Sequence, residues 1–241
     1  MLSKNEIKGI QSLHQKKVRE EERLFIAEGP KIILELVQTV PKQFKKIYAL
    51  KSWIDKTANA LQNIPFEEIS EIELGKISQL QAPNEVVGVL HHFECVVPQP
   101  KGFILYLDGI QDPGNFGTII RIADWFGIKD IVCGDGCADV YNAKVVQATM
   151  ASIARVNIFY EGGSGWLQQQ SLPKYAAALN GTSIHHLKKM ASGILIIGNE
   201  SKGIRPEVAG QATEHITIPR IGEAESLNAA VATGIILSHI C

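Results

Sequence analysis

The chain has 241 residues, of which 45% are hydrophobic and 20% are charged. This composition is typical of a globular protein and excludes disordered, collagen-like and coiled-coil structures. The formal net charge of -1 provides no overall positive field that would draw the whole molecule onto nucleic acid. Any site for a polyanion must therefore be a local patch.

The cysteines favour a cytoplasmic protein, and the longest apolar stretch is too short for a membrane span. Four cysteines are too few and too unevenly spaced for a disulfide framework: Cys95, Cys133, Cys137 and Cys241. The first ten residues lack the apolar core of a signal peptide. The longest apolar stretch, residues 227–240, is interrupted by polar residues and is shorter than the roughly 20 residues that span a bilayer. We therefore expect no membrane span and interpret this stretch as a buried terminal helix.

A domain boundary is expected near Pro98. The segment from residue 91 to residue 103 contains two prolines and a glycine, which interrupt helix and strand patterns. Residues 1–97 alternate between helical and strand patterns, and this alternation predicts a small α/β domain. The expected helices span 11–23, 30–38 and 52–62, and the expected strands span 46–50 and 86–90.

Residues 98–241 contain short apolar runs rich in strand-forming residues, separated by helix-like segments. The runs span 103–107, 130–133, 156–160, 175–179, 194–197 and 216–218. They predict an α/β domain with a parallel sheet that is covered on both faces. Ligands of such sheets bind outside the carboxyl ends of the strands. Three loops at these ends carry unusual residues.

The first loop follows the strand 103–107 and continues into a helix. Asn115 suits the N-cap of a helix whose apolar residues recur at helical spacing. Arg121 is the only charged residue between Asp112 and Asp124. It either pairs with a neighbouring carboxylate or extends into solvent, or it lies over a cleft and binds a phosphate or an acidic group.

The second loop, G-N-E-S-K-G-I at residues 198–204, follows the strand 194–197. It lacks the lysine and the serine or threonine that a nucleoside triphosphate loop needs after its second glycine, and no G-x-G-x-x-G follows a strand. Gly198 allows a ligand to approach the backbone closely, and Glu200 supplies a carboxylate. A plain strand-to-helix turn is equally compatible with this sequence.

The third loop follows the strand 216–218 and leads into the terminal helix. Ser226 is a candidate N-cap for this helix. Asn228 lies in the first turn of an otherwise apolar helix and needs a partner, because an unpaired buried amide costs on the order of 1 to 3 kcal/mol. Small residues keep the helix thin enough to pack closely against another element or subunit: Ala229, Ala230, Ala232 and Gly234.

Other candidate sites are weaker. Cys133 and Cys137 do not have zinc-finger spacing with the pairs at 91–92 and 185–186, so we expect no metal site. There is no nucleophile elbow and no Ser-His-Asp set. Two basic clusters in the first domain are either solvated faces or contacts to an RNA backbone: Lys16, Arg19 and Arg23, and Lys42, Lys45, Lys46, Lys51 and Lys56.

In this order the three loops resemble the three signature motifs of the SpoU (TrmH-type) RNA ribose 2'-O-methyltransferases of the SPOUT superfamily. The first motif resembles residues 112–127, with Asn115 and Arg121. The second resembles residues 198–204, with Glu200, and the third resembles residues 218–230, with the triplet Ser-Leu-Asn at 226–228. Residues 12–29 resemble the opening of the family's substrate-binding domain.

The resemblance implies a fold, a partner and a cofactor. The C-terminal SPOUT domain would form a deep trefoil knot, one of the rare exceptions to unknotted chains, and would assemble as a homodimer through the last helix. The cofactor would be S-adenosylmethionine, bent in the knot. Its expected contacts are Gly198, Asn199, Ile218 and Leu227, together with the adenosine-contacting residues Leu179, Asn180 and Gly181.

The resemblance also implies the reaction, in which a ribose 2'-oxygen of an RNA attacks the sulfonium methyl group. Arg121 is the residue implied to help deprotonate the hydroxyl. An arginine stays protonated, so we expect it to bind the adjacent phosphate and to stabilise the developing alkoxide. Asn115, Ser226 and Asn228 are expected to orient ribose and cofactor, and Glu200 completes the expected catalytic set. Arg220 departs from the family, which more usually has an apolar residue there.

The substrate is expected to be ribosomal RNA rather than transfer RNA, because a separate N-terminal substrate-binding domain is present. The alternatives are a transfer RNA ribose methyltransferase and a non-catalytic RNA-binding or ribosome-assembly factor with the same fold. The non-catalytic alternative has no evident need for all five expected catalytic residues. A nicotinamide-dependent oxidoreductase lacks its glycine fingerprint.

Overall fold

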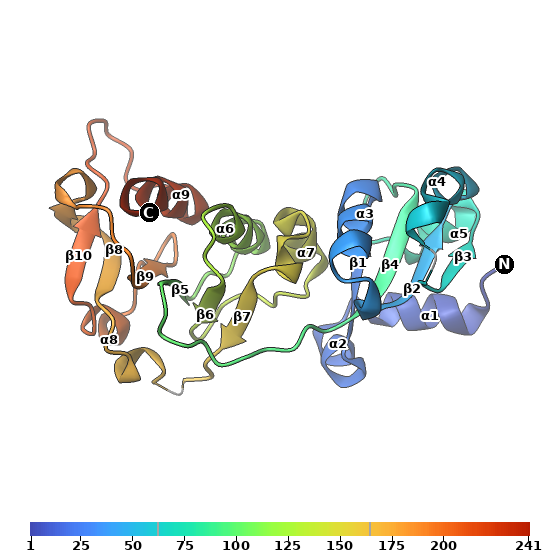
Figure 1. Ribbon diagram of the computed structural model, residues 1–241, viewed down its shortest axis with the longest axis horizontal. Helices are drawn as coiled ribbons and strands as arrows, with labels where there is room; N and C mark the ends of the chain where they lie inside the picture. The colour runs from blue at the N-terminus through green and yellow to red at the C-terminus, as the bar shows by residue number, and fades with distance from the viewer. Residues whose placement is uncertain (62, 164) are drawn as a thin grey trace. The chain divides into compact units, whose positions relative to one another are not determined.

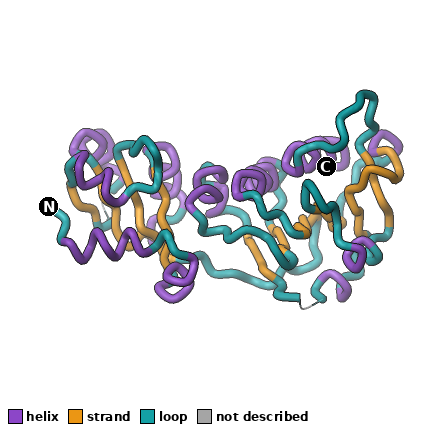
Figure 2. The backbone as a smooth tube through the Cα atoms, turned by 180° about the vertical axis from the view of Figure 1, so that it is seen from behind, coloured by secondary structure: helices purple, strands orange, loops and turns teal. Residues whose placement is uncertain are grey.

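The computed structural model describes residues 1–61, 63–163 and 165–241 (Figure 1). Backbone packing divides the chain into two compact units. The first contains residues 1–94 and 141–154, and the second contains residues 95–140 and 155–241. Within the described ranges, every helix is too short or too polar to cross a membrane. Figure 2 shows, from behind, that both units combine strands with flanking helices.

The first unit is built on a sheet with the strand order β1-β4-β2-β3. The central strand β4 is antiparallel to β1 and to β2, whereas β3 is parallel to β2. The strands are β1 (Leu24–Glu28), β2 (Phe44–Ala49), β3 (Phe66–Glu68) and β4 (Val86–His91). The helices are α1 (Lys4–Ser12), α2 (Lys16–Glu22), α3 (Pro30–Thr39), α4 (Lys51–Thr57), α5 (Glu71–Ile77) and α7 (Ala143–Thr149).

The predicted helices at 30–38 and 52–62 correspond to α3 and α4, and residue 62 lies outside the described residues. The predicted strands at 46–50 and 86–90 are confirmed as β2 and β4. The prediction of one helix over 11–23 is wrong, because the chain forms α1 and α2 with a turn between them. Ser3 fixes the start of α1 through a capping box, in which its hydroxyl accepts from the Glu6 backbone N–H.

The second unit is built on a parallel sheet with the strand order β10-β8-β9-β5-β6-β7, which confirms the predicted α/β class. Its helices are α6 (Pro113–Trp125), α8 (Pro206–Ala209) and α9 (Ala229–Ile240). All six predicted strands are present: β5 (Phe103–Asp108), β6 (Asp130–Cys133), β7 (Asn157–Tyr160), β8 (Lys174–Ser183), β9 (Gly193–Gly198) and β10 (Glu214–Thr217).

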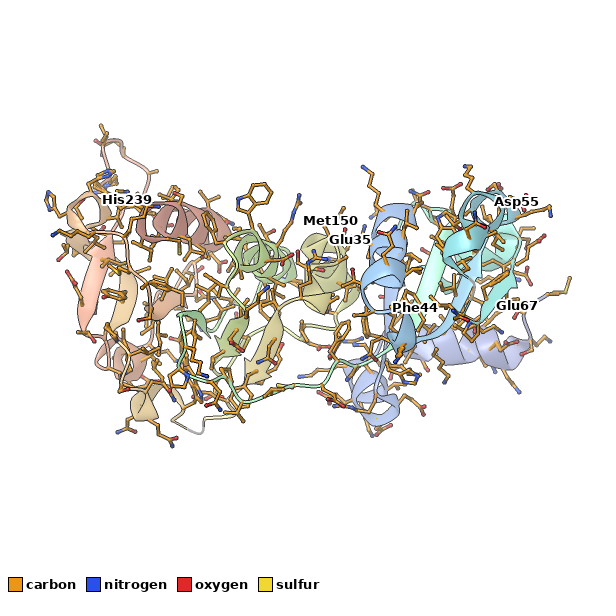
Figure 3. All side chains as sticks on the ribbon, in the orientation of Figure 1. Glu35, Phe44, Asp55, Glu67, Met150 and His239 are labelled. Carbon is orange, nitrogen blue, oxygen red and sulfur yellow. The ribbon has the colours of Figure 1, made fainter. Side chains whose placement is uncertain are left out.

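Alternation along the strands buries both faces of this sheet. Ile104 and Tyr106 of β5 belong to a core that includes Trp166 and Val208, on the side of α8. The intervening residues of β5 are also fully buried, and α6 and α9 pack together on the other side (Figure 1). Side chains fill the space between sheet and helices (Figure 3). This arrangement leaves the carboxyl ends of β5, β8, β9 and β10 along one edge.

Candidate active site

The first two motif loops begin side by side. β5 and β9 are neighbouring parallel strands, and Asp108 at the end of β5 lies opposite Gly198 at the end of β9. β8 lies next to β9, and β10 lies next to β8. The third loop, which follows β10, therefore starts from the same edge of the sheet, as the sequence predicts.

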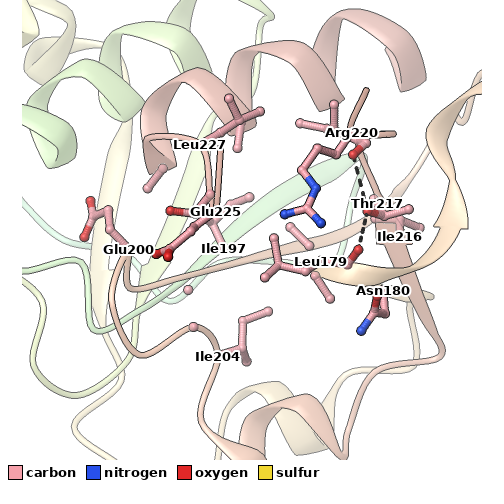
Figure 4. Close-up of a pocket in the computed structure, with 18 of the residues that line it drawn as sticks. Leu179, Asn180, Ile197, Glu200, Ile204, Ile216, Thr217, Arg220, Glu225 and Leu227 are labelled. Carbon is pink, nitrogen blue, oxygen red and sulfur yellow. Dashed lines mark hydrogen bonds between the residues drawn. The ribbon is translucent and has the colours of Figure 1, made fainter. Parts of the chain in front are cut away.

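A cavity of about 780 Å³ lies at this edge (Figure 4). Its volume is in the range of small-molecule and cofactor sites. Among the predicted cofactor residues, six line it: Leu179, Asn180, Gly198, Asn199, Ile218 and Leu227. Gly181 is adjacent in sequence but is not a lining residue. Among the predicted catalytic residues, Glu200 and Ser226 line the cavity.

The second loop closes on itself at the end of β9. The backbone N–H of Asn199 donates to the Gly203 carbonyl at 3.1 Å, and the Gly203 N–H donates back to the Asn199 carbonyl at 2.8 Å. A Cβ atom at residue 198 would lie 2.4 Å from the Gly203 carbonyl carbon, so only glycine fits there. Gly203 itself has a φ of +68°. The cavity is therefore bordered on this side by closely packed backbone.

A bulge in β8 forms the opposite side of the cavity. Ala176 pairs with His215 of β10, whereas the next pair joins Thr182 to Ile216, so residues 177–181 have no partners on β10. A Cβ atom at residue 181 would lie 2.4 Å from the His215 carbonyl oxygen, so the glycine at this position allows the two strands to approach this closely. The predicted strand 175–179 is thus part of a longer, bulged strand that directs Leu179 and Asn180 to the cavity (Figure 4).

Two predicted helix caps are wrong. Asp112, not Asn115, caps α6, and its Oδ1 accepts from the Asn115 backbone N–H at 2.8 Å. Asn228, not Ser226, caps α9, and its Oδ1 accepts from two backbone N–H groups, those of residues 230 and 231, at 3.0 and 3.2 Å. The two residues that were predicted as caps lie close to the actual caps. Asn115 lies in the first turn of α6, and Ser226 lies in the exposed loop before α9.

A hydrogen-bond chain joins the three motifs. The Asn115 side-chain Nδ2 donates to Oε1 of Glu200. The Asn228 side-chain Nδ2 donates to Oδ1 of Asn115 at 2.7 Å. Asn115 therefore lies between the other two residues and is the partner of Asn228. The expectation that the Asn228 amide is buried is wrong, because this residue lies at the exposed start of α9.

Arg121 lies apart from this chain. It is exposed on α6, and among the described residues it forms no hydrogen bond or ion pair. The neighbouring carboxylate of Asp124 is bound by Arg155, whose Nε and Nη2 atoms both lie 2.7 Å from the Asp124 Oδ2 atom. Pairing of Arg121 with a neighbouring carboxylate is therefore not observed, and the guanidinium is available to an external anion.

Arg220, where the family more usually has an apolar residue, lines the cavity. Its guanidinium donates to the Ala224 carbonyl at 3.3 Å, which braces the start of the third loop. Thr217 braces the other side, because its hydroxyl donates to the Leu179 carbonyl at 3.0 Å. The loop itself, residues 219–228, is exposed and projects from the sheet (Figure 1).

One ion pair at this edge, between a buried carboxylate and a half-buried arginine, was not predicted from the sequence. Asp108, only 1% exposed, accepts from the backbone N–H and the side-chain Nε of Arg205, both at 2.7 Å. The hydrogen bond to this carboxylate raises the pKa of Arg205. An aspartate that ends an apolar strand is a signal of such a pair, because buried charges are nearly always paired.

The basic cluster at the N-terminus is only partly a surface feature. Arg19 is buried, and its NH1 donates to two backbone carbonyls, those of residues 13 and 14, at 2.8 and 2.9 Å. Lys46 of the second cluster is held by Glu67 at 2.6 Å and by Glu6 at 3.3 Å. Lys42 and Lys45 are exposed. Among the described residues, no three His, Cys, Asp or Glu side chains gather as metal ligands.

Comparisons with known proteins identify the family. Residues 102–238 match the SpoU rRNA Methylase family, and residues 4–88 match the MRM3-like substrate binding domain. The 23S rRNA (guanosine(2553)-2'-O)-methyltransferase RlmP of Bacillus subtilis is 29% identical over 238 residues, which cover 97% of this chain and 95% of that protein.

Solved structures agree with these matches. A TrmH-family protein from Porphyromonas gingivalis matches with a TM-score of 0.87 and 36% identity, over 99% of this chain and 98% of that one. An rRNA methyltransferase from Sinorhizobium meliloti, solved with AdoMet bound, matches with a TM-score of 0.85 and 30% identity, over 99% and 95% of the two chains. These matches confirm the family that the three motifs predict, and with it the expected enzyme class and cofactor. The chain belongs to the SpoU rRNA methylase family.

Proposed function

We propose that this protein transfers a methyl group from S-adenosylmethionine to a ribose 2'-hydroxyl of ribosomal RNA, with transfer RNA as the alternative substrate. The observation that carries the proposal is the hydrogen-bond chain Glu200–Asn115–Asn228, whose Glu200 lines the cavity. Its two bonds join residues that are 85 and 113 positions apart in the sequence. A residue from each motif takes part in it. The likeness to RlmP over nearly the whole of both chains favours the large-subunit ribosomal RNA.

The cavity fits the cofactor. The close approach of Gly198 to Gly203 brings backbone groups to its wall, and backbone groups at 198, 218 and 227 would hold the nucleoside and the amino acid ends. Glu200 and Glu225 line the same cavity, and their carboxylates favour a bound cation. When bound, S-adenosylmethionine supplies the electrophilic methyl group.

The residues of the chain provide orientation and charge. Asn115 is held by Glu200 and Asn228, so its amide is fixed before the substrate arrives. Ser226 lines the cavity and would contact the ribose. Arg121 would bind the phosphate next to the target ribose and stabilise the negative charge that develops on the 2'-oxygen as its proton passes to water. These roles require no proton transfer to the guanidinium.

We also propose the deep trefoil knot and the homodimer that the family implies. In support of the knot, the Met190 N–H donates to the Ile240 carbonyl at 2.8 Å, so the segment before β9 touches the end of α9. In support of the dimer, α9 leaves Val231 50% and Ile235 37% exposed. Apolar side chains on this helix would be covered by a second copy.

We further propose that residues 1–97 form the RNA substrate-binding domain and residues 98–241 the methyltransferase domain. The match of residues 4–88 to a substrate-binding domain supports the first part. The exposed Lys42 and Lys45 supply local positive charge for an RNA backbone. A cytoplasmic location fits the four free cysteines.

The test is transfer of labelled methyl from S-adenosylmethionine to separate pools of unmodified ribosomal RNA and transfer RNA. We expect label in the ribosomal pool at a ribose 2'-oxygen. Arg121→Ala should lower the rate by about 100-fold or more, with cofactor affinity unchanged. Lys129→Ala, an exposed cation outside the motifs, is the matched control.

Each other outcome contradicts a defined part of the proposal. Label confined to transfer RNA would establish the alternative substrate. Wild-type turnover by Arg121→Ala would exclude the role of the guanidinium. Failure to bind S-adenosylmethionine would favour the non-catalytic RNA-binding factor.

A further inference from the structure

Two cysteines lie together at the carboxyl end of β6. Cys133 is the last residue of this strand, is 1% exposed and pairs with Leu107 of the neighbouring strand β5. Cys137 is half-buried, and its Sγ lies 3.2 Å from the Leu107 carbonyl oxygen. The two thiols also form a hydrogen bond with each other. The proposed methyl transfer uses neither thiol, so the pair is open to another role.

The turn between the two cysteines holds both sulfur atoms in the same place. The Gly134 N–H donates to the Leu107 carbonyl at 2.9 Å, and the Ala138 N–H donates to the Ile110 carbonyl at 2.9 Å. Gly136, with a φ of 81°, reverses the chain between these two bonds. A disulfide requires such an approach, because its sulfur atoms are about 2 Å apart and its Cβ atoms about 4 Å apart. Backbone bonds to β5 and the loop after it therefore bring the two thiols within reach of one covalent bond.

The two thiols differ in the ease with which they ionise. The hydrogen bond from Cys133, and then the backbone N–H groups of Ile110 and Gly109, lower the pKa of Cys137. Burial raises the pKa of Cys133, and it also raises the pKa of Cys241 at the end of the chain. The thiolate is the form that reacts with oxidants. Cys137 is therefore expected to react first, with the Cys133 thiol beside it to complete the reaction.

We propose that Cys133 and Cys137 form an oxidation site, at which a hydroperoxide such as hydrogen peroxide joins the two thiols in a disulfide and thereby weakens cofactor binding. The Cys137 thiolate attacks one oxygen of hydrogen peroxide to form a sulfenic acid, the O–O bond breaks, and the second oxygen takes up a proton and leaves as water. The Cys133 sulfur then attacks the Cys137 sulfur, the S–O bond breaks, and the hydroxyl group leaves as water with the Cys133 proton. The two thiols together lose two electrons, which reduce the peroxide to two water molecules.

The first motif loop connects this site to the cofactor cavity. The backbone N–H groups that bind the Cys137 sulfur belong to Gly109 and Ile110, and the Gly109 carbonyl accepts from the Asn199 side chain at 2.9 Å. Asn199 lines the cavity, and its Oδ1 accepts from the backbone N–H groups of residues 201 and 202 at 2.9 and 3.1 Å. A disulfide moves the Cys137 sulfur towards Cys133 and away from the first motif loop. The backbone that holds Asn199 then loses support, so oxidation is expected to lower the affinity for S-adenosylmethionine.

A metal site explains the pair less well. A structural zinc ion takes four ligands, whereas no third Cys, His, Asp or Glu joins the two thiols in the part of the chain that the structure describes. An inert core residue would explain the buried Cys133, but not the half-buried Cys137 with its bonds to backbone N–H groups. Transient disulfides in cytoplasmic proteins are typically catalytic or redox-sensing, which agrees with the proposed location.

The first measurement is the mass of one peptide from the wild-type protein. Trypsin cleaves after Lys129 and Lys144 and releases both cysteines in the peptide 130–144. After treatment with hydrogen peroxide and then iodoacetamide, we expect this peptide to be lighter by two hydrogen atoms and to carry no alkyl group. Dithiothreitol before alkylation should restore two alkylated cysteines. A doubly alkylated peptide after peroxide, a disulfide to the peptide that contains Cys95, or equal oxidation of all four cysteines would overturn the proposal.

The second measurement is the affinity for S-adenosylmethionine of reduced, oxidised and re-reduced protein, by isothermal titration. We expect oxidation to lower the affinity at least about fivefold, the effect of one lost hydrogen bond, and dithiothreitol to restore it. The matched control is the double variant Cys133→Ala with Cys137→Ala, whose affinity peroxide should leave unchanged. An equal loss in this variant would place the cause outside the pair and overturn the inference. Unchanged affinity in fully oxidised wild-type protein would overturn the connection to the cofactor cavity.

Cys133→Ala separates the two steps of the reaction. It retains Cys137 without its partner, so peroxide should add oxygen to the peptide 130–144 and remove no hydrogen. Cys95→Ala, which removes an exposed cysteine outside the pair, should form the disulfide at the wild-type rate. A peptide of Cys133→Ala that peroxide leaves unmodified would show that Cys137 is not the reactive thiol. None of these measurements uses RNA, and the mass of the wild-type peptide needs no variant, so this inference is tested independently of the proposed substrate.

Discussion

The side chain of Asn228 donates to that of Asn115 at 2.7 Å, and this bond connects the first turn of α9 to the first turn of α6. The Asn228 Oδ1 already accepts from two backbone N–H groups, so only its Nδ2 remains for Asn115. Asn115 must then present its oxygen to Asn228 and its nitrogen to Glu200. The cap of α9 thus sets the direction of both hydrogen bonds in this chain.

Asn228→Asp tests this direction. Aspartate retains the oxygen that caps α9, but its second oxygen cannot donate to Asn115. The Asn115 amide would turn to donate to it, and its oxygen would then face the Glu200 carboxylate. We expect the methyl-transfer rate to fall at least about tenfold, the effect of a mispaired polar group. The midpoint of thermal unfolding should stay within about 2 °C of wild type.

Asn228→Ala is the matched comparison, because it removes both the cap and the donor. It should lower the free energy of unfolding by about 1 kcal/mol as well as the rate. Wild-type turnover in Asn228→Asp would mean that the bond to Asn115 does not orient the site.

Regular apolar runs explain why most strands could be predicted from the sequence. The central strands β5, β6 and β9 are buried on both faces, and each contains a short apolar run bounded by loop residues. The strand β1 was not predicted, because no glycine or proline marks the boundary between α2 and β1 in the sequence. The turn is made by Arg23, which has a φ of 55°, in the left-handed region that glycine usually occupies.

The site was predicted by motif order, and its contacts were not. Pro113 at the first position of α6 points to Asp112 as the cap, a signal in the sequence that outweighs Asn115. The pairing of Asp108 with Arg205, 97 residues away, depends on the register of β5 against β9. Register follows from packing of the whole sheet, so no local pattern could have revealed this pair.

Gly198→Ala tests the closed second loop. The added methyl group would lie 2.4 Å from the Gly203 carbonyl carbon, a distance that forces backbone to move. We expect the affinity for S-adenosylmethionine to fall at least about tenfold, because loop backbone borders the cavity. Isothermal titration with the cofactor measures this change.

Gly75→Ala is the control for the Gly198 variant, because a Cβ atom there meets nothing within 4 Å and residue 75 lies in α5, outside the methyltransferase cavity. Its cofactor affinity should equal that of the wild-type protein. Cofactor binding of wild-type strength by Gly198→Ala would show that the loop can open without loss.

Arg205→Ala tests the ion pair with the buried Asp108. The Asp108 carboxylate, which is 1% exposed, accepts from the backbone N–H and from the guanidinium of Arg205. The variant removes the guanidinium and leaves only the backbone N–H. We expect the free energy of unfolding to fall by about 2 kcal/mol, the cost of an incompletely satisfied buried acceptor. Urea denaturation measures it.

A double-mutant cycle with Asp108→Asn identifies the cause. If the ion pair is responsible, the double variant Asp108→Asn with Arg205→Ala is more stable than the sum of the single effects predicts. Strict additivity would mean that the loss comes from packing of the arginine stem and not from the unpaired carboxylate.

Glu73 makes the free energy of unfolding of the first unit dependent on pH. Its carboxylate accepts from the Ser70 N–H at 2.9 Å, from the Ser70 hydroxyl at 2.8 Å and from the Leu2 N–H at 2.6 Å. These bonds, those from Ser70 first, lower the pKa of Glu73 from 4.5 to about 2. Because the pKa in the folded state lies below the unfolded value, the carboxylate stabilises the fold fully above pH 4.5 and progressively less as the pH falls to about 2.

Glu73→Gln removes this ionisation. Its melting temperature should lie below that of the wild-type protein by a constant margin from neutral pH down to about pH 5, and the margin should shrink between about pH 4.5 and pH 2. Circular dichroism melts at several pH values measure it. Glu71→Gln, an exposed carboxylate in the same helix turn, is the control and should show no such narrowing. If the difference in melting temperature between the wild-type protein and Glu73→Gln is as wide at pH 2 as at pH 7, the stabilisation does not depend on the charge of Glu73.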